Sequence, residues 1–232
     1  MSDTIKQPRS IGVIVDGNRR WAKERNLPSL LGHQAGYEKL VQFTDWVAEA
    51  GFSCMYMYLF STENWNRTTD EVNYLMDLNR KYLTDVPEKF VEKGYRFRAA
   101  GQRWRLADDI QKLITIAEEK TAHCTKMTVV MCVSYGGRAE IVEAVNALVK
   151  DNARPKGEVT EAMLTSYMWT HNLPDPDIIF RTSGEHRLSG FLTWGSVYSE
   201  FFFPKVQFPG LTKQDFQAML DEYAQRQRRF GK

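Results

Sequence analysis

The feature that most constrains the fold of this chain is the alternation of short β-branched runs with stretches of helical periodicity. Apolar runs at residues 11–15, 53–60, 96–100, 127–133 and 177–180 have the length and composition of buried strands, and residues 201–203 are a candidate for a last one. Apolar residues at helical spacing occur in residues 37–50, from residue 69, in 110–117, 141–148 and 161–170, and after Thr212. This alternation predicts an α/β fold, with a central, mainly parallel sheet covered on both faces by helices. We expect a single domain over residues 1–232, with residues 1–9 as a flexible N-terminal segment.

The composition fits one globular domain and excludes several classes of function. Hydrophobic residues make up 43% of the 232 positions and charged residues 26%. A formal net charge of +2 gives no overall basic field, so we expect no nucleic-acid partner. The three cysteines have no metal-site or disulfide spacing, which fits a reducing compartment. No apolar run approaches the roughly 18 residues of a membrane span. We therefore expect a cytoplasmic protein with at most peripheral membrane contact.

The segment after the first predicted strand combines a carboxylate with arginines. Residues 16–21 read D-G-N-R-R-W, so Asp16 stands beside Arg19 and Arg20 where a strand gives way to a helix. In parallel sheets ligands bind beyond the carboxyl ends of the strands. A carboxylate next to cations at such a place indicates Mg²⁺ bridging Asp16 and a diphosphate. The alternative, that Asp16 only caps the following helix, stays open at this point.

Two other strand ends carry similar chemistry. Residues 60–67, F-S-T-E-N-W-N-R, offer hydroxyls, a carboxylate, an amide and a guanidinium beside two large aromatic residues, although several of them are also good turn formers. After residue 180, Arg181 and Arg187 bracket a glycine turn between serines, an arrangement suited to a diphosphate. Glu200 is either a second metal carboxylate or a surface charge. Taken together, the strand ends predict a site for a diphosphate attached to an apolar group.

The same segments resemble the cis-prenyltransferases, the family of undecaprenyl diphosphate synthase. The motifs D-G-N-x-R-W-A, G-H-x-x-G, F-S-T-E-N-W-x-R, Y-G-G-R, R-T-x-G-E-x-R-L-S, Y-S-E and R-x-G occur in this order at residues 16–22, 32–36, 60–67, 135–138, 181–189, 198–200 and 229–231. The matches span nearly the whole chain. The D-D-x-x-D motif of the trans-prenyl synthases is absent, because the adjacent Asp108 and Asp109 are followed by I-Q-K.

The resemblance implies a homodimer with a hydrophobic product tunnel and Mg²⁺-dependent condensation of isopentenyl diphosphate with an allylic prenyl diphosphate, which forms cis double bonds. It assigns catalysis to Asp16 and Asn64, and Mg²⁺ binding to Asp16 and Glu200. It implies that Arg229 and Gly231 reach the site of the partner subunit. The substrate-binding positions that it implies are Gly17, Asn18, Arg19, Arg20, Trp21, His33, Ser61, Thr62, Glu63, Trp65, Arg67, Arg181, Arg187, Leu188 and Ser189.

Departures from the family pattern bear on substrate and product. Ser29 stands where many members have an arginine, so one diphosphate contact is missing. Leu59 stands where many long-chain members have alanine, which predicts a short to medium product if its side chain narrows the tunnel. The alternative, that Leu59 is an ordinary core residue, is equally open. Two other functions stay open as well: a non-catalytic partner subunit of a heteromeric prenyltransferase, and an irregular-coupling isoprenyl diphosphate synthase on the same fold.

Overall fold

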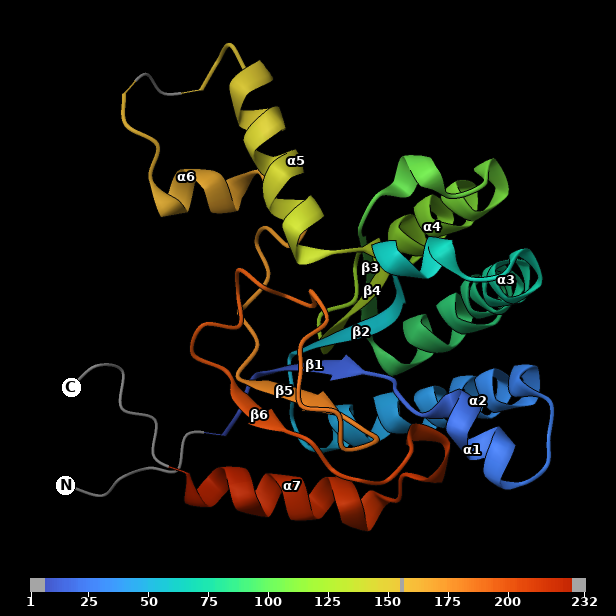
Figure 1. The fold of residues 1–232 in the computed structure, drawn as a ribbon. Coiled ribbons are helices and arrows are strands. Elements are labelled where there is room, and N and C mark those ends of the chain that lie inside the picture. The colour runs from blue at the N-terminus through green and yellow to red at the C-terminus, as the bar shows by residue number, and fades with distance from the viewer. Residues whose placement is uncertain (1–6, 155–156, 227–232) are drawn as a thin grey trace.

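The structure, a computed structural model, describes residues 7–154 and 157–226. Its sheet has six strands in the order β3-β4-β2-β1-β5-β6, and every neighbouring pair is parallel (Figure 1). The strands are β1 (Ser10–Ile14), β2 (Cys54–Ser61), β3 (Tyr95–Ala100), β4 (Met127–Tyr135), β5 (Ile178–Arg181) and β6 (Glu200–Phe202). The prediction of a parallel α/β sheet is confirmed, with strand bounds displaced by one or two residues.

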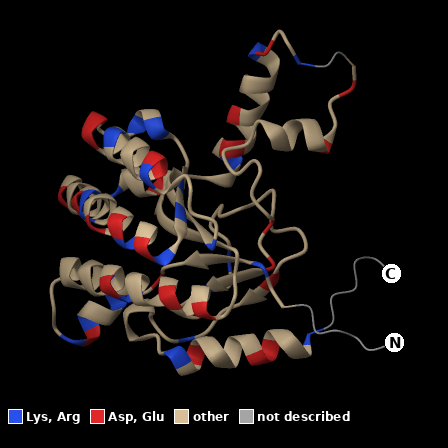
Figure 2. Cartoon of the chain, turned by 180° about the vertical axis from the view of Figure 1, so that it is seen from behind, with Lys and Arg blue, Asp and Glu red and all other residues tan. Residues whose placement is uncertain are grey.

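Four helices cover one face of the sheet and enclose the larger part of the core. They are α2 (Ser29–Glu49), α3 (Thr69–Lys93), α4 (Asp108–Thr121) and α7 (Lys213–Gln225). Phe43 of α2 is fully buried and lies between the rings of Phe180 in β5 and Phe216 in α7, with centroid distances of 5.9 and 5.0 Å. Charged residues of both signs are interspersed on these outer helices (Figure 2). The helices thus present an apolar stripe to the sheet and a mixed charged face to water.

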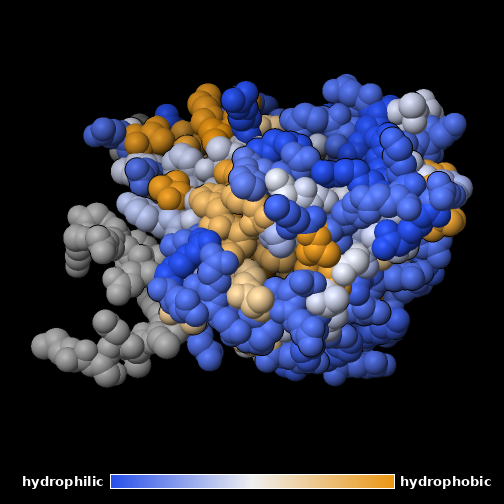
Figure 3. All heavy atoms as spheres, turned by 60° about the horizontal axis from the view of Figure 1, so that its bottom comes forward, coloured by the Kyte–Doolittle hydropathy of each residue, from blue (hydrophilic) through white to orange (hydrophobic). Residues whose placement is uncertain are grey.

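The opposite face of the sheet is covered mainly by irregular chain. Tyr58, Tyr135 and Phe191 form a buried aromatic cluster there, and Trp169 and Leu188 pack against the same core. The helices α5 (Gly137–Lys150) and α6 (Glu161–Ser166) project from the body of the protein (Figure 1). In another view the molecular surface is largely hydrophilic, with apolar residues gathered in a band across it (Figure 3).

The start of α2 is the main difference from the sequence prediction. The helix begins at Ser29 rather than at residue 37, because two glycines that weaken helical propensity serve the contact with α1 (Asn18–Glu24). A Cβ at Gly36 would lie 2.5 Å from Asn18 Oδ1, and one at Gly32 would lie 2.1 Å from the Asn18 carbonyl oxygen. Only glycine lets the two helices approach this closely. The predicted cap of the last helix is confirmed, since the Thr212 side chain accepts a hydrogen bond from the Asp215 N–H.

The ends of the chain lie partly outside the described residues, and so do Arg229 and Gly231. Within the predicted N-terminal segment, the backbone N–H of Arg9 donates to Asp177 Oδ2 at 2.7 Å, and the carbonyl of Arg9 accepts from Ser53 and Cys54. The chain is therefore held in place from Arg9 onward. Across residues 7–154 and 157–226, every helix is too short or too polar to cross a membrane.

Candidate active site

Three strands end at the same edge of the sheet and bring distant segments together. Ile14, at the end of β1, pairs with Tyr58 of β2 on one side and with Arg181 of β5 on the other. Asp16 follows β1 directly, and Ser61 is the last residue of β2. The carboxyl edge of the sheet therefore gathers the three motifs that the sequence places after these strands.

Asp16 and Arg181 form the central ion pair of this edge. Asp16 Oδ2 accepts hydrogen bonds from Nη2 and Nε of Arg181 at 2.7 and 3.1 Å, and only 5% of Arg181 is exposed. Asp16 Oδ1 accepts from the Gly17 N–H at 2.7 Å and from Arg20 at 3.3 Å. Burial raises the pKa of the Asp16 carboxyl, but Arg181, the Gly17 N–H and Arg20 together outweigh it and hold the pKa below its ordinary value of 3.8. Asp16 is therefore ionised at neutral pH.

Further arginines and hydroxyls surround this pair. Arg181 Nη1 donates to Ser189 Oγ at 2.9 Å and to the carbonyl oxygen of Arg187 at 2.6 Å, which fixes the loop after β5. Glu185 accepts hydrogen bonds from both Arg20 and Arg187 and so connects two guanidinium groups from separate segments. Ser183 and Ser189 have φ angles of 75° and 51°, a left-handed conformation that non-glycine residues adopt at a cost and that clusters at functional sites.

One cavity joins this polar edge to an apolar interior between α2, α3 and the sheet. Its volume is about 350 Å³, at the lower end of the range of small-molecule sites. Polar side chains line one part of it: Asp16, Asn18, His33, Ser61, Asn64, Arg67, Arg181, Arg187 and Ser189. Largely apolar side chains line the rest: Ile14, Val15, Tyr37, Leu40, Tyr58, Leu59, Leu75, Leu78, Asn79 and Tyr82. A second hollow adjoins the polar end and is lined by residues that include Gly17, Arg19 and Arg20.

Glu71 of α3 organises the cations beside the cavity. Its carboxylate accepts a hydrogen bond from Arg67 at 2.9 Å and lies 3.7 Å from Arg19 Nη1. His33 Nε2 is 3.4 Å from Glu71 Oε1 but forms no hydrogen bond with it. Burial lowers the pKa of His33, an effect that Glu71 opposes and Arg67 reinforces, so the net pKa lies below 6.5. His33 is therefore neutral at pH 7 and can act as a hydrogen-bonding partner of a ligand.

Several buried polar atoms at this end have no hydrogen-bond partner. Within the described residues, no hydrogen-bond partner is found for Asn18 Oδ1, His33 Nε2 or Ser183 Oγ. Groups of this kind call for an explanation, because leaving a buried polar atom unbonded costs roughly 1–3 kcal/mol. Their position beside Asp16 and the arginines indicates that this end of the cavity is built for a polar, anionic ligand.

The side chains present limit the kind of metal ion that the site could hold. The described residues contain no group of three His, Cys, Asp or Glu side chains that could enclose a metal ion. Mg²⁺ commonly binds one or two carboxylates and completes its shell with water and substrate phosphates. The single carboxylate of Asp16, facing a cavity with unpartnered polar atoms, fits an ion of that kind.

Most of the substrate-binding residues predicted from sequence lie on the cavity or on the adjoining hollow, but some do not. Trp21 packs under the guanidinium of Arg25, and Leu188 packs against the aromatic core. Trp65 stacks edge-on against Phe60 and donates its indole N–H to Ser134. Thr62 donates to Glu63 at 3.1 Å, and neither of these lines the cavity.

Asn64 combines a local structural role with a place on the cavity. Its amide oxygen accepts a hydrogen bond from the Ser61 N–H at 3.1 Å, which closes a capping box at the start of a short 3₁₀ helix, Thr62–Asn66. The alternative prediction, that residues of this segment form a turn, is therefore also confirmed. The amide nitrogen of Asn64 remains the group available to a ligand. Its predicted part in catalysis stays a prediction.

The expected convergence of Glu200 with Asp16 does not occur in this chain. Glu200 begins β6 opposite Ile178, whereas Arg181 lies three residues further along β5, at the carboxyl edge. Its carboxylate accepts a hydrogen bond from Arg226 at 2.9 Å, and it does not line the cavity that Asp16 lines. The sequence puts Glu200 directly before the strand predicted at residues 201–203, and in the structure Glu200 is the first residue of that strand. Its role as a metal ligand stays a prediction.

Sequence reasoning missed other residues of the site. Glu71 of α3 pairs with Arg67, which precedes the helix, and nothing in the local pattern singles it out as a site residue. Tyr58, whose hydroxyl donates to the Ser189 carbonyl at 3.0 Å, reads as an ordinary strand residue. Tyr37 and Asn79 fall on predicted helices, and nothing local distinguishes them from their neighbours. Only the packing of α2 against α3 reveals their place on the cavity.

Known proteins with the same sequence pattern and fold identify the family. Residues 14–231 match the family model of undecaprenyl diphosphate synthase. A (2Z,6E)-farnesyl diphosphate specific trans,polycis-polyprenyl diphosphate synthase from Thermobifida fusca is 43% identical over 97% of this chain and 80% of its own length. An isoprenyl transferase from Thermotoga maritima is 42% identical over 98% of each chain.

A solved structure extends the likeness to the whole backbone. Lavandulyl diphosphate synthase from Lavandula x intermedia, in complex with dimethylallyl diphosphate, superposes with a TM-score of 0.92. The two chains are 30% identical, and the match covers 99% of this chain and 100% of the other. The family model, the relatives and the fold agree with the motifs at the strand ends. The chain therefore belongs to the cis-prenyltransferases, the family of undecaprenyl diphosphate synthase, and is an enzyme that transfers prenyl groups.

Proposed function

We propose that this enzyme condenses isopentenyl diphosphate with an allylic prenyl diphosphate, in the presence of Mg²⁺, to give a (Z)-polyprenyl diphosphate. The observation that carries the proposal is the single cavity with two unlike ends. One end offers Arg181, Arg187 and unpartnered polar atoms to a diphosphate, and the other offers Leu40 and Leu75 to a hydrocarbon chain. The substrates and products of such a condensation have these two parts.

The polar end is suited to the departure of diphosphate from the allylic substrate. As the allylic carbon–oxygen bond breaks, negative charge develops on the diphosphate and positive charge on the carbon. A carbon–carbon bond to the double bond of isopentenyl diphosphate then forms, and a proton is lost. Arg181 is nearly buried, so its charge acts on the leaving group in a medium of low dielectric constant. The aromatic and aliphatic walls exclude water that would quench the carbocation.

Mg²⁺ is proposed at Asp16 because the carboxylate there is ionised and faces the cavity. The ion would neutralise part of the diphosphate charge. Asp16 is also hydrogen-bonded to Arg181, so the two groups hold each other in place before any ligand enters. Glu200 is not needed for this arrangement within one chain.

The product is proposed to be of short to medium length. Leu59 lines the cavity, which favours one of the two alternatives that the sequence leaves open, and it takes up room where a smaller residue would leave space. The cavity volume of about 350 Å³ supports the same conclusion. The relative from Thermobifida fusca, which is (2Z,6E)-farnesyl diphosphate specific by name, favours an allylic primer of moderate length.

A homodimer is proposed on the evidence of an exposed apolar stripe. Val142, Val145 and Val149 follow one another at helical spacing on α5 and are 57%, 42% and 67% exposed. A projecting helix with such a stripe is suited to isologous contact with a second copy. Size-exclusion chromatography with light scattering tests this: wild type should elute as a dimer, and Val145→Glu should shift it toward the monomer.

Irregular coupling is the second candidate, and one observation favours it. Lavandulyl diphosphate synthase, which was solved in complex with dimethylallyl diphosphate, has a very similar backbone, with a TM-score of 0.92, and this supports the second candidate. A catalytically silent partner subunit is less well supported, because Asp16, Arg181 and Arg187 are all present and lie together.

The three free cysteines are buried and unpaired, which supports the proposal of a cytoplasmic, reducing location.

One experiment separates these functions. Purified protein is incubated with Mg²⁺ and ¹⁴C-isopentenyl diphosphate, together with dimethylallyl, geranyl or farnesyl diphosphate, and the products are resolved by length and double-bond geometry. Labelled chains with new cis double bonds support the proposal, and chelation of Mg²⁺ with EDTA should abolish them. A separate incubation with dimethylallyl diphosphate as the only substrate, read out by mass spectrometry, tests the second candidate, and a coupled product there would show irregular coupling. Absence of any product would contradict both.

A further inference from the structure

The cavity is lined by one stripe from each of two helices. At spacings of three and four residues, α2 contributes His33, Gly36, Tyr37 and Leu40, and α3 contributes Leu75, Leu78, Asn79 and Tyr82. His33 and the start of α3, at Glu71, belong to the polar end. At 1.5 Å per residue, Asn79 lies about 12 Å further along the α3 axis than Glu71. Asn79 therefore stands deep in the part of the cavity that is proposed for the hydrocarbon chain.

Asn79 is an unusual residue for this position. It is 94% buried, since only 6% of it is exposed, and its neighbours on the same helix stripe are Leu75 and Leu78. Its amide forms no hydrogen bond with any other residue in 7–154 or 157–226. Asparagine also has poor helix propensity, so neither the helix nor the core gains from it. Because Asn79 lines the cavity and its amide has no protein partner there, the amide is left to contact whatever fills the cavity.

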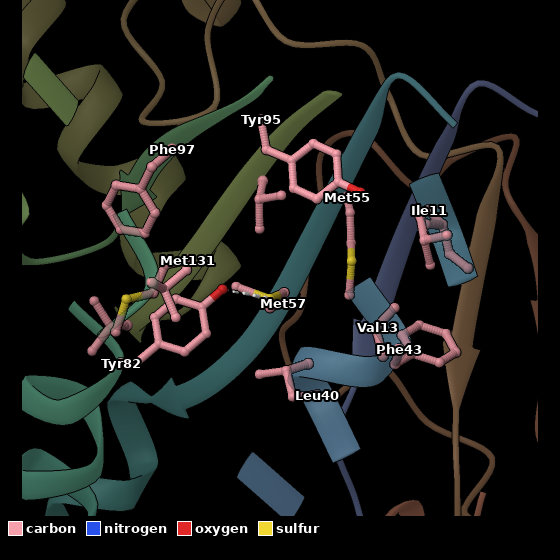
Figure 4. Packing of buried hydrophobic residues seen from close by; sticks show 14 of the residues in the cluster. Ile11, Val13, Leu40, Phe43, Met55, Met57, Tyr82, Tyr95, Phe97 and Met131 are labelled. Carbon is pink, nitrogen blue, oxygen red and sulfur yellow. Dashed lines mark hydrogen bonds between the residues drawn. The ribbon is translucent and has the colours of Figure 1, made fainter. Parts of the chain in front are cut away.

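Two phenol groups line the same part of the cavity. Figure 4 shows the Tyr82 ring reaching from α3 toward Met57 of β2, and its hydroxyl has only the weakly accepting sulfur as partner, at 3.7 Å. Tyr37 packs edge-on against Tyr82 with ring centroids 6.0 Å apart, and within the described residues its hydroxyl is unbonded. The apolar part of the cavity thus carries three polar groups with unused hydrogen-bonding capacity, of which Tyr37 is half-buried.

We propose that the Asn79 amide, together with the Tyr37 and Tyr82 hydroxyls, sets the length of hydrocarbon chain that the cavity accepts. Water can satisfy these groups while no chain reaches them, but an isoprenoid chain has no donor or acceptor and cannot. A chain long enough to cover Asn79 removes water from the amide and returns no hydrogen bond. This penalty lowers the affinity for such a chain by about ten- to a hundredfold. The inference rests on the proposed function and names the limit on its product.

A limit set by lost hydrogen bonds differs from a limit set by bulk. If size alone stopped the chain at the depth of Asn79, then Tyr82 would act as a plug, and the chemistry of residue 79 would be immaterial. The substitution Asn79→Leu distinguishes the two. It replaces the amide with an apolar group that is no smaller, so a steric limit predicts products of equal or shorter length. Loss of the polar group predicts longer ones.

The test measures binding and product length separately. A series of saturated n-alkyl diphosphates of increasing length is titrated into wild type, Asn79→Leu and Asn79→Gln, with tryptophan fluorescence as the readout. In wild type the affinity should rise about fourfold for each buried methylene until the chain reaches Asn79, and should then level off or fall. Asn79→Leu should continue the rise, with ten- to a hundredfold tighter binding just beyond the wild-type break. Asn79→Gln, which keeps an amide, should retain the break.

Product analysis and thermal stability complete the design. With Mg²⁺ and isopentenyl diphosphate, Asn79→Leu should yield longer chains than wild type, and its melting temperature should not fall. A break at the same chain length in wild type and Asn79→Leu would overturn this inference alone and leave the proposed function intact. Failure of every alkyl diphosphate to bind wild type would overturn the proposed function, and this inference with it.

Discussion

The ion pair between Asp16 and Arg181 should be strongly coupled, and a double-mutant cycle measures this. Arg181→Met keeps the aliphatic length of the side chain but removes both hydrogen bonds to Asp16, and Asp16→Ala removes the carboxylate. Hydrogen bonds to charged groups contribute about 1.5–3 kcal/mol each, and the Asp16 side chain is 25% exposed, which reduces the sum by solvent screening. We expect a coupling free energy of about 2 kcal/mol at pH 7.

Urea denaturation of wild type, both single variants and the double variant supplies the four free energies of unfolding. The pair Lys81–Asp85 is a matched control, because it has similar geometry at 2.9 Å but is exposed on α3. Because solvent screens an exposed pair, its coupling should be far smaller than that of Asp16 and Arg181. A coupling for Asp16 and Arg181 no larger than that of the control would refute the idea that this pair organises the site.

The pH dependence of the coupling provides a second check of the same pair. The pKa of Asp16 in the folded state is lowered from 3.8. The stability contributed by its ionised form is therefore fully present above pH 3.8 and is lost as the pH falls through the lowered folded-state pKa. The coupling should decline below pH 3.8. A constant coupling through that range would show that the Asp16 charge is not its source.

Three further outcomes are expected. Gly36→Ala should lower the free energy of unfolding by about 1–3 kcal/mol, because the new Cβ would lie 2.5 Å from the Asn18 amide. Gly210→Ala is the control and should change it by less than about 0.5 kcal/mol, because its nearest contacts are 3.8 Å away. Equal effects in urea denaturation would contradict the close-contact argument. Because burial lowers the pKa of His33 below 6.5, the free energy of unfolding should fall as the pH drops below 6.5, and His33→Gln should reduce that fall. Denaturation of both proteins at pH 7 and pH 5.5 measures the fall. An equal fall in wild type and His33→Gln would contradict this prediction. Leu59→Ala should lengthen the products, and an unchanged length distribution rejects its blocking role.

The strands and most helices follow from local pattern, but α2 shows where that pattern stops. Its first two turns contain Gly32 and Gly36, which read as loop residues because they weaken an isolated helix. The reason for them is the backbone and amide of Asn18, fourteen or more positions earlier in the chain. A requirement of tertiary packing thus overrides local propensity, and no local pattern records it.

The sequence likewise predicts some residues of the site and not others. The motifs placed Asp16, Arg181 and Ser61 correctly, because the carboxyl ends of neighbouring parallel strands necessarily meet. Glu200 begins β6 opposite Ile178, so the rule that brings the carboxyl ends of strands together does not apply to it. Asn79 escaped notice because helical periodicity marks a face of α3 but not what lies opposite it.

Elongation by an Asp16→Asn variant tests the central claim most directly. The substitution keeps the size of the side chain and removes the charge that is proposed to hold Mg²⁺ and diphosphate. With labelled isopentenyl diphosphate and the preferred allylic primer, turnover should fall by on the order of a hundredfold or more, while circular dichroism shows an unchanged fold. Turnover within a few-fold of wild type would contradict the account.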